Sequence, residues 1–162
     1  MVKVVIVNSS PIIVLAKIGK LELLRKLFDS VVITEQVYEE ILLKPTYLET
    51  IAIKKVIESD KWLKVQKSDE IIKSLGVGES SSISLAKKLE QPLILDDKRA
   101  ASIAATFGIE CHGTLYVVLE ALKRKIIKDK EEAINIVNQL INNNLYLSSD
   151  ALSEFYKLLN KI

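Results

Sequence analysis

The feature that most constrains the fold is a repeated alternation of short β-branched runs with longer segments of helical periodicity. Strands are predicted at residues 2–7, 31–33, 62–65, 93–95 and 109–111. Strands joined through helices in this way pair in parallel, because right-handed crossovers place the helices on the faces of the sheet. The sequence therefore predicts an α/β fold with a mainly parallel central sheet.

Turn and capping residues set the expected helix boundaries. Ser10 and Pro11 are predicted as the N-cap and first residue of the helix that Gly19 ends. Thr34 and Thr114 are predicted to cap helices over 35–43 and 114–125. The other predicted helices cover residues 21–28, 46–58, 68–75, 78–89, 98–107, 130–143 and 149–160. Since no linker, repeat or low-complexity stretch divides the chain, we expect one domain over residues 1–162.

Composition bounds the possible functions only loosely. The 162 residues are 49% hydrophobic and carry a net charge of +2, which neither indicates nor excludes a nucleic-acid partner. A single cysteine, Cys111, cannot form an internal disulfide, and the N-terminus lacks a signal-peptide pattern. No apolar run approaches the ~18 residues that a membrane helix needs. The expectation is a cytoplasmic protein without a membrane span.

Polar residues follow two of the predicted strands, at the edge where parallel sheets place their ligand clefts. Asn8 follows VVIV, and Asp96 and Asp97 follow LIL. Adjacent carboxylates raise one another's pKa unless a cation compensates, and a metal ion is one such cation.

Helical geometry selects two more acidic residues that turn toward the buried side of their helices. Glu40 lies about 60° from Val37 on the helical wheel, whereas Glu39 lies about 160° away and should face water. Glu79 lies about 40° from Ile83, in a first turn where a carboxylate also meets the positive end of the helix dipole. Glu40 and Glu79 are therefore candidates for the same cleft.

Five fragments in this order resemble the PIN-domain ribonucleases, in particular the archaeal and bacterial branch related to VapC-type toxins. They are NSSPIIVLAKIG, VVITEQVYEEI, GVGESSSISLAKKL, LILDDKRAASIA and GIECHGTL, and they span nearly the whole chain. The resemblance implies a three-layer α/β/α sandwich whose strand-end acidic residues bind Mg²⁺ or Mn²⁺ and hydrolyse RNA. It also implies a toxin-like role beside an antitoxin protein, and a homodimer.

By this resemblance the catalytic positions are Asn8, Glu40, Glu79, Asp96 and Asp97, and Ser10 matches a small hydroxyl residue of the substrate site. Glu79, Asp96 and Asp97 would ligate the metal, with Glu40 a ligand through water or a base that orients water. Carboxylates suit this chemistry because Mg²⁺ and Mn²⁺ prefer oxygen ligands and can activate a bound water. Lys98 and Arg99 would contact phosphate.

Asn8 departs from the family pattern, in which most active members carry aspartate at this position. An amide oxygen can ligate a metal but brings no charge, so metal affinity should fall. The alternative function is therefore a catalytically weak or inactive PIN-like module that binds RNA or protein. A phosphoacceptor receiver domain also carries an acidic pair after a strand, but there the pair follows the first strand.

Each candidate residue also has a purely structural interpretation. Asn8 could form an Asx turn, Asp97 could cap a helix, Glu79 could complement a helix dipole, and Glu40 could lie on the surface. Lys98 and Arg99, like the basic run 123–125, could be solvated, and His112 beside Cys111 is too little for a zinc site. The apolar run TLYVVLEAL could serve a homodimer or simply cover the sheet.

Overall fold

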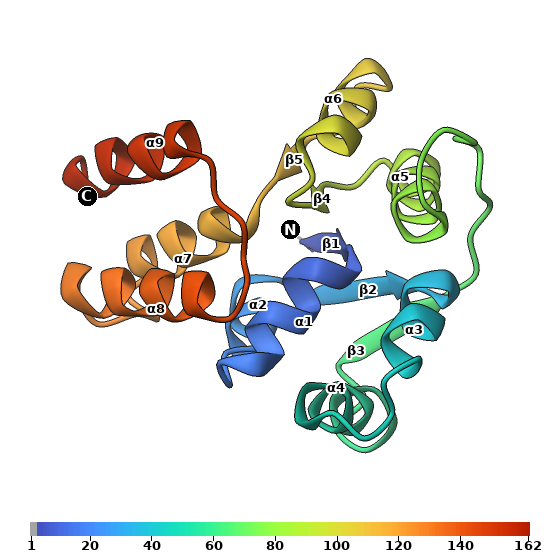
Figure 1. Cartoon of the computed structure of the whole chain (residues 1–162), viewed down its shortest axis with the longest axis horizontal. Helices are drawn as coiled ribbons and strands as arrows, with labels where there is room; N and C mark the ends of the chain where they lie inside the picture. Colours follow the sequence, from blue (N-terminus) through green and yellow to red (C-terminus); the bar gives the residue numbers. More distant parts are fainter. Residues whose placement is uncertain (1–2) are drawn as a thin grey trace.

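The structure is a computed structural model that describes residues 3–162, and it confirms a five-stranded, wholly parallel sheet between layers of helices (Figure 1). The strand order is β3-β2-β1-β4-β5. The elements in chain order are β1 (Val4–Val7), α1 (Ser9–Lys17), α2 (Glu22–Leu27), β2 (Ser30–Thr34), α3 (Glu35–Leu42), α4 (Leu48–Glu58), β3 (Leu63–Gln66), α5 (Val77–Leu89), β4 (Leu93–Ile94), α6 (Lys98–Thr106), β5 (Cys111–His112), α7 (Thr114–Lys123), α8 (Lys130–Asn142) and α9 (Ser149–Asn160). Val2, predicted to begin the first strand, lies outside the described residues.

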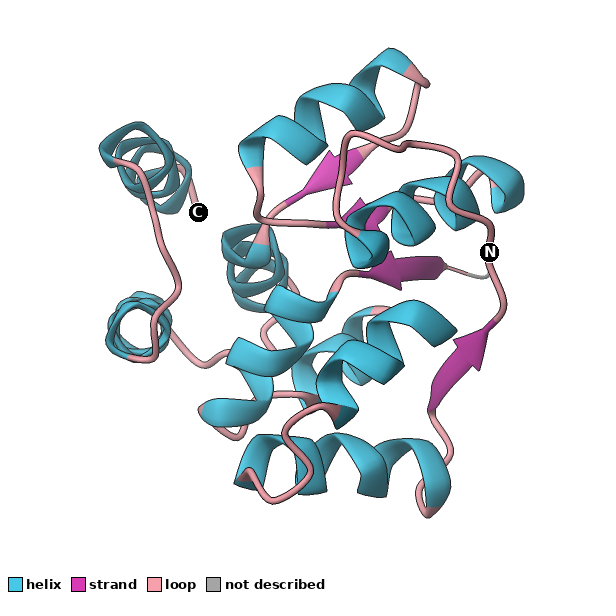
Figure 2. Cartoon of the chain, turned by 45° about the vertical axis from the view of Figure 1, so that its right-hand side comes forward, coloured by secondary structure: helices cyan, strands magenta, loops and turns pink. Residues whose placement is uncertain are grey.

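Alternating side chains of the strands divide the core into two clusters, one on each face of the sheet. Val5 and Val7 face the larger cluster, which contains residues of α1 to α4 and α7 to α9. Ile6 of the same strand faces the smaller cluster, which contains residues of α5 and α6. This period of two follows from the pleat of a strand and produces the three-layer α/β/α arrangement. Figure 2 shows α8 and α9 at the margin of the molecule, connected by a long segment.

The segment 68–75, predicted as a helix, is irregular instead. Its backbone N–H groups bond to serine hydroxyls of α5 rather than to carbonyls of a helix of its own. The N–H of Ile71 donates to Ser84 Oγ at 3.1 Å, and the N–H of Ile72 donates to Ser80 Oγ at 3.0 Å. The prediction was wrong because these tertiary hydrogen bonds outweigh a helical periodicity of only eight residues.

Two predicted helix starts are shifted by one or two residues. The N-cap of α1 is Asn8 rather than Ser10, and the N-cap of α7 is Gly113 rather than Thr114. The side chains of Asn8 and Thr114 make no capping bond, because each binds a group of another element, as described below. By contrast Thr34 caps α3 as predicted, with Val37 N–H donating to its Oγ1 at 3.0 Å.

The apolar run of α7 is covered by the chain itself. Its Leu115, Val117, Val118, Leu119 and Leu122 are buried in the larger core cluster. The core thus takes up most of this apolar run, and its Leu115 and Leu119 also line the cavity described below. No helix among residues 3–162 is long and apolar enough to cross a membrane.

Replacing Thr34 by valine should destabilise the fold by about 1–3 kcal/mol. The buried Thr34 hydroxyl both caps α3 and bonds Ser81 Oγ at 2.8 Å, and valine keeps the shape while removing both bonds. The measurement is the free energy of unfolding in urea. The control is Thr106→Val, the same change at an exposed site. Equal effects of the two substitutions would contradict the role given to Thr34.

Candidate active site

A cavity of about 930 Å³ lies at the carboxyl edge of the sheet, beside the neighbouring strands β1 and β4. At this point the strand order changes direction: β2 and β3 are added on one side of β1, and β4 and β5 on the other. It is lined by all eight residues singled out from the sequence, namely Asn8, Ser10, Glu40, Glu79, Asp96, Asp97, Lys98 and Arg99. Such a reversal in strand order is where open α/β sheets bind ligands, because the helices diverge there. The structure thus brings these residues to one cavity, while their chemical roles remain predictions.

Asn8 is nearly fully buried and is held from two sides. Its backbone N–H donates to Ile94 O at 3.0 Å, which extends the pairing of β1 with β4 past the end of the strand. Its side-chain Oδ1 accepts a hydrogen bond of 3.2 Å from Ser82 Oγ of α5. Asn8 is therefore not an Asx turn: its amide is fixed across the sheet edge by another helix.

Glu40 of α3 reaches the same point as Asn8. A Cβ placed on Gly78 of α5 would lie 2.7 Å from Glu40 Oε2 and 3.6 Å from Asn8 Oδ1. The glycine therefore lets a carboxylate and an amide oxygen converge beside the start of α5. Glu40, not Glu39, lines the cavity, in agreement with the helical-wheel argument.

Asp96 is partly buried and is held by the start of α7. Its Oδ1 accepts from Thr114 N–H at 2.8 Å and its Oδ2 accepts from Thr114 Oγ1 at 2.6 Å. Burial raises the pKa of this carboxyl above its ordinary value, and the two Thr114 hydrogen bonds oppose that shift only in part. A Cβ on Gly113 would lie 2.9 Å from Asp96 Oδ1, so glycine keeps room for the carboxylate here.

Asp97 and Glu79 lie at helix starts, and in this conformation each is turned toward its own backbone. Asp97 Oδ1 accepts from Ala100 N–H at 2.8 Å and so caps α6. Glu79 Oε2 lies 2.5 Å from the point where a Cβ on Gly76 would stand, which places it over the first turn of α5. Asp97 thus acts as a helix cap, and Glu79 lies where it complements the dipole of α5. Both residues also line the cavity, where each can have a second role.

The donor atoms around the cavity are oxygens of the kind that Mg²⁺ and Mn²⁺ prefer. Within residues 3–162, however, no group of three or more carboxylate, histidine or cysteine side chains is close enough to hold one ion. The donor set therefore fits a hard divalent ion in chemistry but is not assembled around one point. To hold an ion, Asp97 would have to give up the hydrogen bond by which it caps α6.

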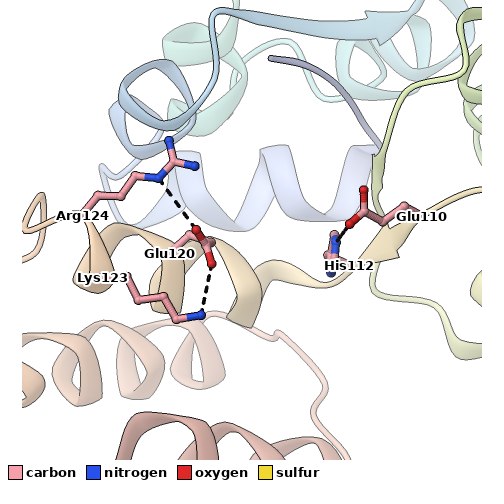
Figure 3. A network of polar contacts seen from close by, with 5 residues as sticks. All are labelled: Glu110, His112, Glu120, Lys123 and Arg124. Carbon is pink, nitrogen blue, oxygen red and sulfur yellow. Dashed lines mark hydrogen bonds and ion pairs between the residues drawn. The ribbon is translucent and has the colours of Figure 1, made fainter. Parts of the chain in front are cut away.

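The basic residues fall into two groups with different roles. Lys98 and Arg99 are exposed at the start of α6 and line the cavity. Lys123 and Arg124 lie at the other end of α7, where both pair with Glu120, at 3.3 Å and 3.7 Å (Figure 3). Arg124 also donates to Leu27 O at 3.1 Å, so it joins α7 to the end of α2. Only the first group is placed to contact a substrate in this cavity.

Cys111 and His112 offer no nucleophile beside the carboxylates. Burial, aided by the charge of Asp96, raises the pKa of the Cys111 thiol to about 11, so it stays protonated at neutral pH. His112 lies 3.1 Å from Glu110 Oε1 (Figure 3), and its ring stacks on Tyr116 with centroids 3.8 Å apart. A protonated thiol is a poor nucleophile, so Cys111 is not placed to act as one here.

Sequence reasoning missed Ser82 and Thr114 as site residues, although signals for both were present. Ser82 stands three residues after Glu79, so helical spacing places both on the same side of α5. Thr114 follows β5 closely, at the same sheet edge as Asn8 and Asp96. The side of the cavity formed by residues 144–158 had no such signal, because it comes from the segment between α8 and α9 and from α9 itself.

Comparison with protein families shows that the chain belongs to DUF3368, a PIN domain family, which matches residues 4–161. Among solved structures, it is similar to a PilT N-terminus domain protein from the hyperthermophilic archaeon Sulfolobus solfataricus P2. That similarity has a TM-score of 0.50 and 16% sequence identity, and covers 70% of this chain and 89% of that one, so it shows the fold alone. No curated protein matches.

Asp96→Asn should raise the melting temperature at pH 7 by a few degrees. Because the pKa of Asp96 is raised in the folded state, the folded protein binds its proton more tightly than the unfolded chain does. Its ionisation therefore costs stability progressively as pH rises from its ordinary pKa through its folded pKa. Asparagine removes that cost, and the gain should vanish below the ordinary carboxyl pKa, at about pH 3.

Melting temperatures of Asp96→Asn and wild type across this pH range test the expectation. The matched control is Asp129→Asn, which changes an exposed carboxylate that caps α8. A loss of stability at pH 7 specific to Asp96→Asn would show that the Thr114 hydrogen bonds outweigh the burial of Asp96.

Proposed function

We propose that this PIN domain is a metal-dependent endoribonuclease and the toxin-like component of a toxin–antitoxin pair. The observation that carries the enzymatic part is the gathering of five oxygen-donor side chains from four separate parts of the chain in one cavity, beside Lys98 and Arg99. Placing several carboxylates at one edge of the sheet costs free energy through their mutual repulsion, so a purely structural role does not explain their gathering. The toxin-like part, with Asn8 in place of the first aspartate of a VapC-type site, rests on the resemblance of the five sequence fragments.

In this proposal the residues divide the work of phosphodiester hydrolysis. When bound, Mg²⁺ or Mn²⁺ would supply the chemistry of an activated water and of charge neutralisation on the phosphoryl oxygens. Asp96, Asp97 and Glu79 provide the ligands, and Glu40 with Asn8 orients water at the Gly78 corner. Lys98 and Arg99 hold the phosphate at the opening of the cavity, and Ser10, exposed on the cavity wall, contacts the substrate.

A catalytically weak or inactive module that binds RNA or protein is the second candidate. Two observations favour it: Asn8 contributes an uncharged oxygen, and the described carboxylates are not assembled around a single ion. This candidate differs from the first in the fate of the RNA, which it binds without cutting.

Asn8→Asp should strengthen Mn²⁺ binding and speed cleavage of single-stranded RNA, by roughly tenfold if it adds about 1.4 kcal/mol of ion binding. Without the ion it should lower the melting temperature, because the new buried carboxylate faces Glu40 at the Gly78 corner. Melting curves with and without Mn²⁺ and cleavage of a labelled RNA measure both effects.

Two controls accompany this test. Asn138→Asp makes the same change at an exposed position of α8 and should leave both quantities unchanged. Asp97→Asn should abolish cleavage while keeping the α6 cap, since asparagine caps helices as well as aspartate does. If Asn8→Asp gains neither ion-dependent stability nor cleavage rate, the nuclease proposal loses its mechanism and the binding module replaces it.

We also propose a homodimer, and the surface that supports it lies around the α3–α4 connection rather than on α7. Leu43, Tyr47, Leu48 and Ile51 are exposed around the α3–α4 connection, with Leu48 82% accessible. A cluster of large apolar side chains in water favours burial against a partner surface.

Sedimentation at micromolar concentration should show a dimer that Leu48→Glu converts to monomer. Val77→Glu, which places the same charge on an exposed apolar residue of α5, should leave the dimer intact. A monomer in the wild-type protein would refute the dimer.

A further inference from the structure

The cavity continues from the carboxylates along an apolar surface between α7 and α9. This apolar wall contains Leu115 and Leu119 of α7, Leu145 and Leu147 of the connecting segment, and Phe155 and Leu158 of α9. The carboxylates and the two basic residues therefore occupy one part of the space, and hydrocarbon lines the other. An occupant that matches both parts has a charged end and an apolar end.

Aromatic rings stand at the junction of these two parts. His112 and Tyr116 line the cavity and stack on each other at an interplanar angle of 12°. They flank Gly113 and Thr114, which hold Asp96, so the ring pair is adjacent in the chain to the group that fixes the carboxylate. Flat aromatic surfaces beside phosphate-binding side chains are typical of sites that stack nucleobases.

Tyr146 supplies a third ring, and the neighbouring leucines fix its position. Leu145 is buried and Leu147 is partly buried against the core, which anchors the segment on both sides of the tyrosine. Tyr146 itself is 87% exposed, yet it lines the cavity, so it stands at the rim. A tyrosine ring left in water at the rim of a cavity contributes little to folding and is available to a ligand.

We propose that this part of the cavity binds one unpaired nucleobase of the RNA strand, stacked against Tyr146 and the His112–Tyr116 pair, while Lys98 and Arg99 hold its phosphate. The proposal rests on the proposed RNA substrate and adds to it a requirement for an unstacked base at the cleavage site. A base buried in a duplex cannot enter such a space, so the substrate class is single-stranded RNA. An apolar protein segment is the less favoured occupant, because it would cover the charged side chains without pairing them.

Equilibrium binding to a short single-stranded RNA of mixed sequence, in EDTA to prevent cleavage, tests the base site. Tyr146→Ala should weaken binding by about 5- to 100-fold, the range for loss of one stacked base, whereas Tyr146→Phe should bind nearly as wild type. Phe107→Ala, which removes another exposed aromatic ring outside the cavity, is the control and should have no effect. The same RNA with a single abasic nucleotide near the cleavage site should bind wild type as weakly as intact RNA binds Tyr146→Ala.

The outcomes separate this inference from the proposed function. If Tyr146→Ala binds and cleaves RNA as wild type does, the base site is refuted while the nuclease stands, and the apolar wall is then a surface for protein. If Tyr146→Ala weakens binding but wild type never cleaves with Mn²⁺, the base site is supported on a silent module. If Tyr146→Ala and Phe107→Ala weaken binding equally, the effect is not specific to the cavity and the base site is refuted.

Discussion

The candidate site depends on the parallel pairing of β1 with β4 at the centre of the sheet. Asn8 N–H donates to Ile94 O, so the residue after β1 is fixed beside the residues after β4, although 88 positions separate Asn8 from Asp96. On the other side of β1, β2 ends at Thr34 and delivers α3 with Glu40 to the same edge. The positions of Asn8, Glu40 and Asp96 all depend on this register. A slip of one residue would exchange the two faces of a strand and move Asn8 out of the edge.

A second constraint is the burial of polar groups around that edge, which short hydroxyl side chains relieve. Ser82 bonds Asn8, Thr114 bonds Asp96, and the Thr34–Ser81 pair joins the end of β2 to α5. Ser80 and Ser84 of α5 accept hydrogen bonds from the backbone N–H groups of Ile72 and Ile71. A serine-rich helix buried to this degree would be costly without such partners, since an unpaired buried hydroxyl costs about 1–3 kcal/mol. The run ESSSIS is thus explained by packing and hydrogen bonding rather than by exposure.

Much of this arrangement could be predicted because it follows from local patterns. The strand ends after VVIV and LIL, the helix sides that place Glu40 and Glu79 at the cavity, and the Thr34 cap all depend on residues within a few positions of one another, although Glu40 is exposed there rather than buried. Local patterns could not predict the irregular conformation of residues 68–75 or the displaced N-caps of α1 and α7. In each case a group from another element takes the hydrogen bond that local rules assign within the segment. The apolar wall was equally hidden, because Tyr146 and Phe155 reach the cavity that Asp96 lines only through the path of the chain after α8.

The amide at Asn8 makes physical sense as a compromise between folding and ion binding. Asn8 is buried beside Glu40 and accepts a hydrogen bond from Ser82. An uncharged amide oxygen can accept this bond without the free-energy cost of burying a charged side chain. A carboxylate in its place would add attraction for a divalent ion, but in the free protein it would add repulsion from Glu40 to its own burial cost. The elevated pKa of Asp96 points the same way, because burial there already disfavours charge. The amide thus lowers the cost of burying Asn8, and in the proposed nuclease the attraction for a divalent ion would have to come from the four carboxylates that line the cavity, Glu40, Glu79, Asp96 and Asp97.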